Sequence, residues 1–153
     1  MRIQQCPSFK GNANSAGDPF TGYNYNASYI GGILVRSGGM ITGSDSSRST
    51  QVLRPSDCAM FGDGEFILGA NKFMRSPQAG RLDTDFGSTY RYSGTQGYRH
   101  LGRTNVSYCD SSAGSVGEIY TETKSKDIIE EYNAKRAVKT GFLSADNSVY
   151  DLK

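Results

Sequence analysis

The 153-residue sequence has no tryptophan, a single histidine and no long apolar run. No stretch approaches the roughly 18 consecutive apolar residues of a membrane-spanning helix, and the first residues lack the apolar segment of a secretory signal. The formal net charge is only +2, from 17 basic and 15 acidic residues spread without long blocks. The clustered basic surface typical of nucleic-acid-binding proteins is therefore missing, and nucleic acid is not an expected partner.

The three cysteines are an odd number at unrelated spacings, which gives neither a complete disulfide framework nor a C-x-x-C metal motif. At least two of Cys6, Cys58 and Cys109 are expected to be buried small apolar residues. A Cys6–Cys58 disulfide is the alternative. A count of three free thiols under denaturing conditions would exclude that bridge.

Glycine is plentiful, at 19 residues, which is well above the roughly 7% usual in soluble proteins. Turns are therefore expected to be numerous and regular elements short. The length fits one domain over residues 1–153. The pattern along the chain predicts several short strands and one helix, so the expected fold is α+β and β-rich, with long loops.

A strand is predicted over residues 23–30, in YNYNASYI. The odd-numbered positions carry Tyr23, Tyr25 and Tyr29, and the even-numbered positions carry Asn24, Asn26 and Ser28. This alternation is the period of two of a half-buried strand. The tyrosines are expected to pack inside the domain. The alternative is that they stack on sugars or on a neighbouring subunit, because tyrosine joins an apolar ring to a hydrogen-bonding tip.

Composition and turn signals predict the remaining elements. Short strands are expected at 33–35, 58–61, 95–100 and 104–109, with a returning strand within 115–123. Exposed loops are expected at 42–50 and, as a long surface excursion, at 76–94. One helix is predicted in 126–139, capped by Ser125 and ending at Gly141, and the tail after it is expected to be ordered.

The Asp63-Gly64 pair predicts a hairpin turn, because Asp-Gly favours the two-residue turns that join antiparallel strands. Asp63 is then a turn former and Glu65 a solvated strand residue. This interpretation is simpler than a catalytic carboxylate pair. No catalytic residue is assigned at this position.

The only histidine, His100, stands ten residues before Asp110, and the two could form a chemical pair or brace separate turns. If 95–100 and 104–109 form a hairpin, the second strand holds them roughly 15 to 18 Å apart at ~3.3 Å per residue. A direct hydrogen bond is then excluded. A metal-dependent hydrolase would need several ligands around His100, which this hairpin argues against, so each residue is predicted to brace its own bend and no enzyme is expected.

These residues, with the segments GYNYNASYIGG, FGDGEF, GANKFMRSP and TGFLSADNSVYDL, resemble the bacterial prepilin-like family named for a His-x9-Asp-Gly motif. That family is related to type II secretion pseudopilins. The resemblance implies a pilin-like antiparallel sheet and a structural or assembly role at the cell envelope, periplasmic or extracellular. Other pilin-like subunits or envelope proteins would be the partners, and membrane contact would come only through an N-terminal apolar helix that this chain lacks.

Ser111 stands where the family pattern has glycine. A two-residue turn at Asp110-Ser111 would require positive φ and would strain serine by roughly 1 kcal/mol. We therefore predict a longer turn that uses Gly114.

Pseudopilin domains of the best-known kind carry a calcium-stabilised loop near the C-terminus. Asp146, Asn147 and Asp151 offer the oxygen ligands that calcium prefers, although only two are carboxylates and no EF-hand spacing is present. A capped turn without metal is the other interpretation, and no other cofactor is expected. The alternative to an assembly role is an extracellular carbohydrate- or ligand-binding module that uses the three tyrosines.

Overall fold

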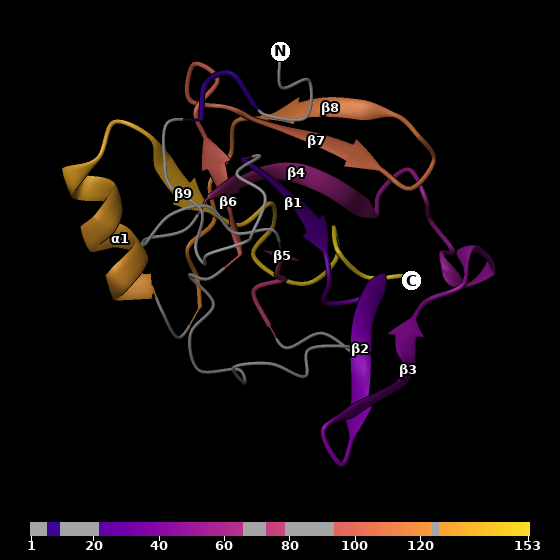
Figure 1. Cartoon of the computed structure of the whole chain (residues 1–153). Coiled ribbons are helices and arrows are strands. Elements are labelled where there is room, and N and C mark those ends of the chain that lie inside the picture. Colours follow the sequence, from indigo (N-terminus) through magenta and orange to yellow (C-terminus); the bar gives the residue numbers. More distant parts are fainter. Residues whose placement is uncertain (1–5, 10–21, 66–72, 79–93, 124–125) are drawn as a thin grey trace.

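The computed structural model describes residues 6–9, 22–65, 73–78, 94–123 and 126–153 (Figure 1). The strands among them are β1 (Tyr23–Asn26), β2 (Gly31–Ser37), β3 (Met40–Ser46), β4 (Ala59–Glu65), β5 (Phe73–Met74), β6 (Thr95–Tyr98), β7 (Thr104–Tyr108), β8 (Ala113–Val116) and β9 (Lys139–Gly141). A 3-10 turn, η1 (Ser49–Gln51), and one helix, α1 (Lys126–Lys135), complete them. The broad α+β, β-rich class is confirmed, and the pilin-like topology stays a prediction. Within these ranges no helix has the length and apolar character to cross a bilayer.

Strand β4 is the centre of a seven-stranded sheet in which β5, β1, β4, β6 and β9 follow one another. On the edge away from β1, β4 pairs with two strands in succession. Residues Ala59 to Gly62 pair with β7, and Gly64 and Glu65 pair with β6. The pairing is therefore interrupted at Asp63.

The predicted reversal between the two later strands is present, but those strands do not form the predicted hairpin. Leu101 and Gly102, with φ of 54° and 78°, make a tight turn that His100 and Arg103 close through reciprocal backbone hydrogen bonds. Beyond this one bridge, β6 and β7 do not pair with each other. Each of them pairs with β4 instead. The Asp63-Gly64 turn is wrong, since β4 runs straight through both residues.

Strands β2 and β3 form a separate two-stranded sheet that projects from the body of the molecule (Figure 1). Gly38 and Gly39, with φ of 57° and 83°, make its turn, and all seven residues of β3 are exposed. The predicted exposed loop at 42–50 is wrong over residues 42–46, which belong to β3, although these residues are exposed; Ser47 is half-buried. The Gly38-Gly39 pair, between the apolar residues 33–35 and 40–41, is the hairpin signal that the prediction overlooked.

The strand predicted at 23–30 begins at Tyr23 but ends at Asn26, and the face it buries is the opposite of the one expected. Asn24, Asn26 and Ser28 are buried, whereas Tyr23 is 41% exposed. The amide of Asn26 explains this inversion, because its Nδ2 donates to two backbone carbonyls at 2.8 Å and its Oδ1 accepts the N–H of Tyr29. Three satisfied hydrogen bonds offset the cost of burying the amide.

The ordered C-terminal tail is confirmed, because it supplies much of the core. Buried apolar residues from the sheet and the tail form one cluster: Tyr29, Ala59, Met74, Val106, Leu143, Tyr150 and Leu152. Helix α1 ends at Lys135 rather than at Gly141. Asn133 bonds both the N–H and the C=O of Thr140, which turns the chain into β9 against β6.

All three cysteines are free in the structure, and Cys6 and Cys58 are buried, as expected of small apolar residues. Cys109 is half-buried, and its backbone N–H donates to the carbonyl of Cys58 at 3.0 Å. Burial raises the pKa of the Cys58 thiol to about 12, and the neighbouring Cys109 makes a smaller contribution in the same direction. Cys58 is therefore a protonated, unreactive thiol at neutral pH.

This raised pKa predicts that native Cys58 resists alkylation. At pH 8 its thiolate fraction should be about a thousandfold below that of an unshifted thiol. We expect iodoacetamide to label Cys58 at least about a hundredfold more slowly in the native chain than in urea, as measured by mass spectrometry of the peptides. Equal rates in the two states would show that this thiol is not buried.

Candidate functional site

A buried polar cluster occupies the interruption between β6 and β7, and Asp63 is its centre. The Asp63 side chain is 1% exposed. Its Oδ2 accepts the backbone N–H of Asn105 at 2.7 Å, and its Oδ1 lies 3.5 Å from Nη1 of Arg99. The Asp63 carboxylate thus accepts the Asn105 N–H near the start of β7, at the point where the backbone pairing along this edge of β4 is interrupted.

Arg99 supplies the buried positive charge of the cluster. Its side chain is 2% exposed, donates to the carbonyls of Gly22 and Gly64, and forms an ion pair with Glu65 at 3.2 Å. Burial raises the pKa of Glu65, while Arg99 opposes that rise. Glu65 is therefore a partner of Arg99 within the fold rather than the solvated residue that the sequence suggested.

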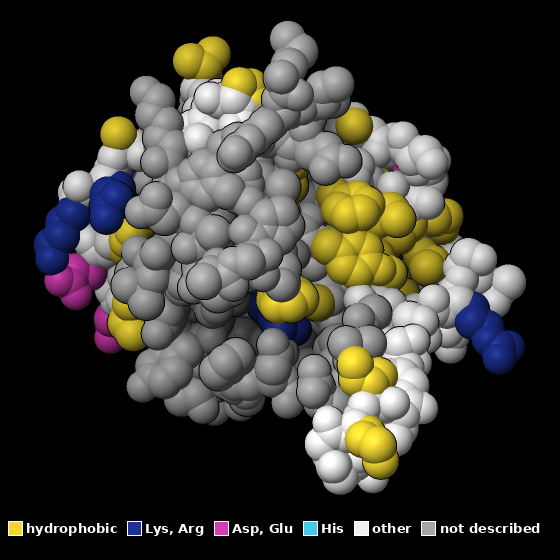
Figure 2. Space-filling model, viewed as in Figure 1, with side chains coloured by type: hydrophobic (Ala, Val, Ile, Leu, Met, Phe, Trp, Pro, Cys, Tyr) yellow, Lys and Arg dark blue, Asp and Glu magenta, His cyan; other side chains and the backbone are white. Residues whose placement is uncertain are grey.

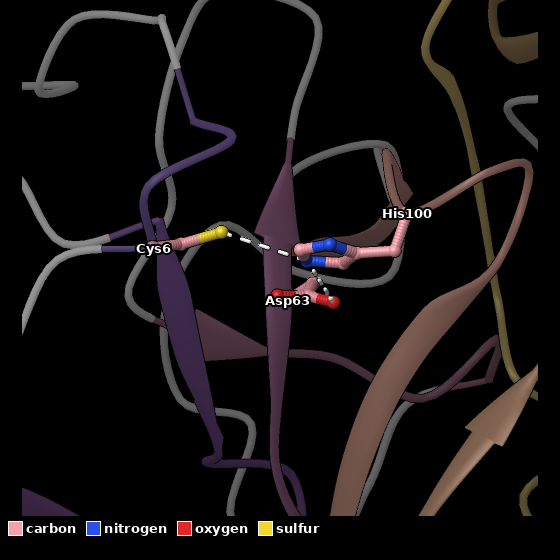
Figure 3. A group of neighbouring side chains, drawn as sticks. All are labelled: Cys6, Asp63 and His100. Carbon is pink, nitrogen blue, oxygen red and sulfur yellow. Dashed lines mark hydrogen bonds and ion pairs between the residues drawn. The ribbon is translucent and has the colours of Figure 1, made fainter.

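His100 reaches the cluster from the tight turn after β6. Its Nε2 lies 3.2 Å from Oδ2 of Asp63 and 3.6 Å from Sγ of Cys6, so three side chains from distant parts of the chain meet at one point (Figure 3). The His100 side chain is 28% exposed, whereas Asp63 and Cys6 are almost fully buried. The ring therefore forms the solvent-facing side of this group.

Cys6 is positioned by a tight turn over residues 6–9. Phe9 N–H donates to the carbonyl of Cys6 at 3.0 Å, and Pro7 supplies the fixed φ that favours the second position of such a turn. The Phe9 ring then packs on Arg99, 4.9 Å from its guanidinium carbon. Gly22 has φ of +73°, and a Cβ there would lie 2.7 Å from the Phe9 side chain, so the turn needs glycine beneath it.

The expectation that no ligands converge on His100 is wrong, because it considered only the segment 95–110, whereas Cys6 and Asp63 approach the ring from other parts of the chain. Cysteine, imidazole and carboxylate can form a nucleophile, base and orienting acid only if the acid holds the ring nitrogen that the nucleophile does not use. Here Cys6 and Asp63 both approach Nε2. The three side chains therefore lack the geometry of such a triad, and their ligand atoms lie close enough together that they could hold one metal ion.

His100 and Asp110 lie at opposite ends of β7 and have different partners. The Oδ1 of Asp110 accepts the N–H of Ser112 at 2.9 Å. Hydrogen bonds from the side chain of Ser112, and then from its backbone, lower the pKa of Asp110. Ser111, with φ of 73°, takes the left-handed position of the turn itself. The predicted use of Gly114 is wrong, because that residue pairs with Val106 within β8.

The candidate calcium ligands each have a protein partner. Asp146 Oδ1 accepts the N–H of Ser148, and Asp151 Oδ1 accepts the N–H of Leu152. Asn147 donates to the hydroxyl of Tyr29 at 2.6 Å, and its Oδ1 accepts the N–H of Gln78. These contacts are those of a capped turn, and calcium binding stays a prediction.

The three tyrosines do not form one exposed cluster. Tyr29 is buried, Tyr25 is half-buried and Tyr23 is exposed. The ring of Tyr25 lies 5.2 Å from that of Phe61, which is 45% exposed on the neighbouring strand β4. We call Tyr23, Tyr25 and Phe61 the aromatic surface. Figure 2 shows hydrophobic side chains gathered above the projecting hairpin.

Asp63, Cys6 and Arg99 are the site residues that the sequence analysis missed. Asp63 was assigned to a turn and Cys6 to the core, and the pairing of β4 with two successive strands has no local signal. The long surface loop predicted at 76–94 lies outside the described residues except at its two ends. Comparison of the chain with protein-family models, curated proteins and solved structures finds no match.

Proposed function

We propose that this chain is the globular domain of a non-enzymatic, pilin-like protein that assembles with further copies of itself at the bacterial cell envelope. The observation that carries the proposal is the projecting β2–β3 hairpin, together with a second apolar surface elsewhere on the same chain. The resemblance around His100 and Asp110 supports the pilin-like assignment and the envelope location. The β-rich domain is compatible with both.

The hairpin has the features of an interaction arm. In the part of the chain that the structure describes, β2 and β3 pair only with each other. Met40 is 73% exposed, Ile41 56% and Val35 46%. An isolated two-stranded hairpin is marginal in water, so contact with a partner that covers these side chains would stabilise it.

The aromatic surface supplies a matching contact on the next copy. Tyr23 and Phe61 are exposed on β1 and β4, which are not strands of the hairpin. When two different surfaces of one chain bind each other, the contact is heterologous, and it extends into a filament unless the rotation closes a ring. Binding of the hairpin of one copy to the aromatic surface of the next copy would be such a heterologous contact, and its repetition would build a filament.

The pairing predicts that Met40→Lys and Phe61→Lys each weaken self-association by at least about tenfold, because each places a charge in a desolvated apolar contact. Sedimentation velocity over a concentration series measures this effect. Leu53→Lys is the control, because Leu53 is 72% exposed and lies outside both surfaces. All three variants should unfold at the wild-type denaturant concentration.

Mixing the two variants tests the heterologous contact itself. Each variant keeps one intact surface, so an equimolar mixture should form dimers that do not grow, while either variant alone stays monomeric. A wild-type chain that remains monomeric at high concentration contradicts the proposal. A monomer that instead binds glycans through Tyr23 would favour the alternative, an extracellular ligand-binding module.

A further inference from the structure

We propose that Cys6, Asp63 and His100 form a binding site for a divalent transition metal, with Zn²⁺ as the best-fitting ion and one coordination position open. This inference is independent of the assembly proposal, because it depends only on the cluster at the β6–β7 interruption. Within the described residues these three are the group of Cys, His and acidic side chains whose ligand atoms lie within 4.8 Å of one another.

Two of the three separations between the ligand atoms fit a tetrahedral ion directly. Zinc bonds of about 2.3 Å to sulfur and about 2.0 to 2.1 Å to nitrogen and oxygen require S···N and N···O separations of about 3.6 and about 3.3 Å. The structure has 3.6 Å between Cys6 Sγ and His100 Nε2, and 3.2 Å between His100 Nε2 and Asp63 Oδ2. The ligand atoms of Cys6 and Asp63 lie within 4.8 Å of each other, so they would have to approach by no more than about 1.2 Å to share one ion.

Cys6 and Asp63 approach the same ring nitrogen of His100, and a bound metal ion would explain why. Nε2 of His100 carries either one proton or one lone pair, so it can make only one good hydrogen bond along its axis. Cys6 and Asp63 nevertheless both point at it (Figure 3). A metal ion between the three atoms uses the lone pair of the nitrogen, the thiolate and the carboxylate together.

Charge and softness select the ion. A thiolate, a carboxylate and a neutral imidazole carry two negative charges, so a divalent cation makes the group neutral at a place where Cys6 and Asp63 are almost fully buried. Thiolate and imidazole prefer zinc and similar transition metals, whereas calcium and magnesium prefer oxygen ligands. The expected order is therefore Zn²⁺ and Co²⁺ well above Ca²⁺ and Mg²⁺.

The surroundings hold the ligands in place. Asn105 N–H and Arg99 orient the Asp63 carboxylate, the closed turn at Leu101 and Gly102 fixes His100, and the 6–9 turn fixes Cys6. Such outer contacts raise metal affinity because they hold the ligands in place before the metal binds, so that less conformational entropy is lost on binding. The partial exposure of the His100 ring gives the ion a path of entry and leaves water for the open position.

Binding converts the Cys6 thiol to a thiolate and releases its proton to the solvent, so affinity should fall as the pH is lowered. The bound ion would fasten the 6–9 turn to the sheet at the point where the β4 ladder is interrupted. The metal has a structural role in this scheme, and no reaction step is assigned to it.

Competition of the full chain against a chromophoric chelator tests the site. We expect one Zn²⁺ per chain, replacement by Co²⁺ with the visible spectrum of a four-coordinate thiolate site, and no competition from millimolar Ca²⁺ or Mg²⁺. Zinc should slow alkylation of Cys6 at least about tenfold and leave the rate at Cys109 unchanged. Protection of Cys109 instead would place the ion elsewhere and overturn the assignment.

Cys6→Ala and His100→Gln should each weaken zinc binding at least about a hundredfold, because loss of a ligand exceeds the cost of losing an outer contact. Cys109→Ala is the matched control, since it removes a thiol outside the cluster and should keep wild-type affinity. Circular dichroism and urea unfolding establish that each variant is folded. Wild-type affinity in folded Cys6→Ala, or failure of the wild-type chain to bind zinc, would refute the proposal.

Discussion

Asp63→Asn is expected to lower the free energy of unfolding of the metal-free chain by about 3 to 5 kcal/mol, the range found when one partner of a buried ion pair is removed. The substitution keeps the shape of the side chain but removes a charge that faces Arg99 and His100 in a buried cluster. One carboxylate oxygen that accepts the Asn105 N–H can also become an NH₂ group, which would set two donors against each other. Urea unfolding in the presence of a chelator measures the effect without any contribution from bound metal.

Asp57→Asn is the matched control for this change. Asp57 forms an ion pair with Arg54 at 3.6 Å, but both side chains are more than half exposed, and exposed pairs contribute about 0 to 1 kcal/mol. The control should therefore unfold close to the wild-type midpoint. Similar small losses in both variants would show that Asp63 does not organise a buried cluster.

Asn26→Asp is expected to destabilise the fold by about 3 kcal/mol or more, because it is nearly isosteric but turns two hydrogen bonds into repulsions. The Nδ2 of Asn26 donates to the carbonyls of Ala59 and Tyr150, and so joins β1 to β4 and to the C-terminal tail. A carboxylate oxygen in its place would face both carbonyls in a fully buried position. The loss should be larger at neutral than at acidic pH, because only the ionised form buries a charge.

Gln51→Glu makes the same amide-to-acid change at the surface, where the side-chain oxygen accepts the N–H of Arg48 and can continue to do so. Its unfolding midpoint should remain near that of the wild type. Thermal and urea unfolding of the pair of variants separates a buried structural amide from a surface one. Equal midpoints for the two variants would contradict the role given to Asn26.

The sequence predicted the existence of most elements better than it predicted which faces they bury. The alternation of Tyr23 and Tyr25 with asparagines correctly indicated a strand. The choice of the buried face was wrong because hydrophobicity was the only criterion. Asn26 is buried because two backbone carbonyls from distant segments need its donors, and that requirement is tertiary. Likewise, α1 ends early because Asn133 bonds Thr140 and not because a glycine stops it.

The site was beyond local sequence reasoning for a related reason. Cys6 and His100 are 94 positions apart, and each has an ordinary local interpretation as a core thiol or a turn residue. His100 meets Asp63 because β6 and β7 share one edge of β4 and leave a gap between them, and the 6–9 turn brings Cys6 to the same place. No periodicity or motif in a single sequence records that two strands will divide the same edge.

Because the chain has one histidine, nuclear magnetic resonance of the ¹¹³Cd²⁺-loaded, ¹⁵N-labelled protein tests the convergence at His100 most directly. We expect one bound cadmium that is scalar-coupled to the ring nitrogen Nε2 and has the chemical shift of a site with a single sulfur ligand. An imidazole whose nitrogens show no coupling to cadmium at saturation, or a metal shift that indicates oxygen ligands alone, would contradict this expectation.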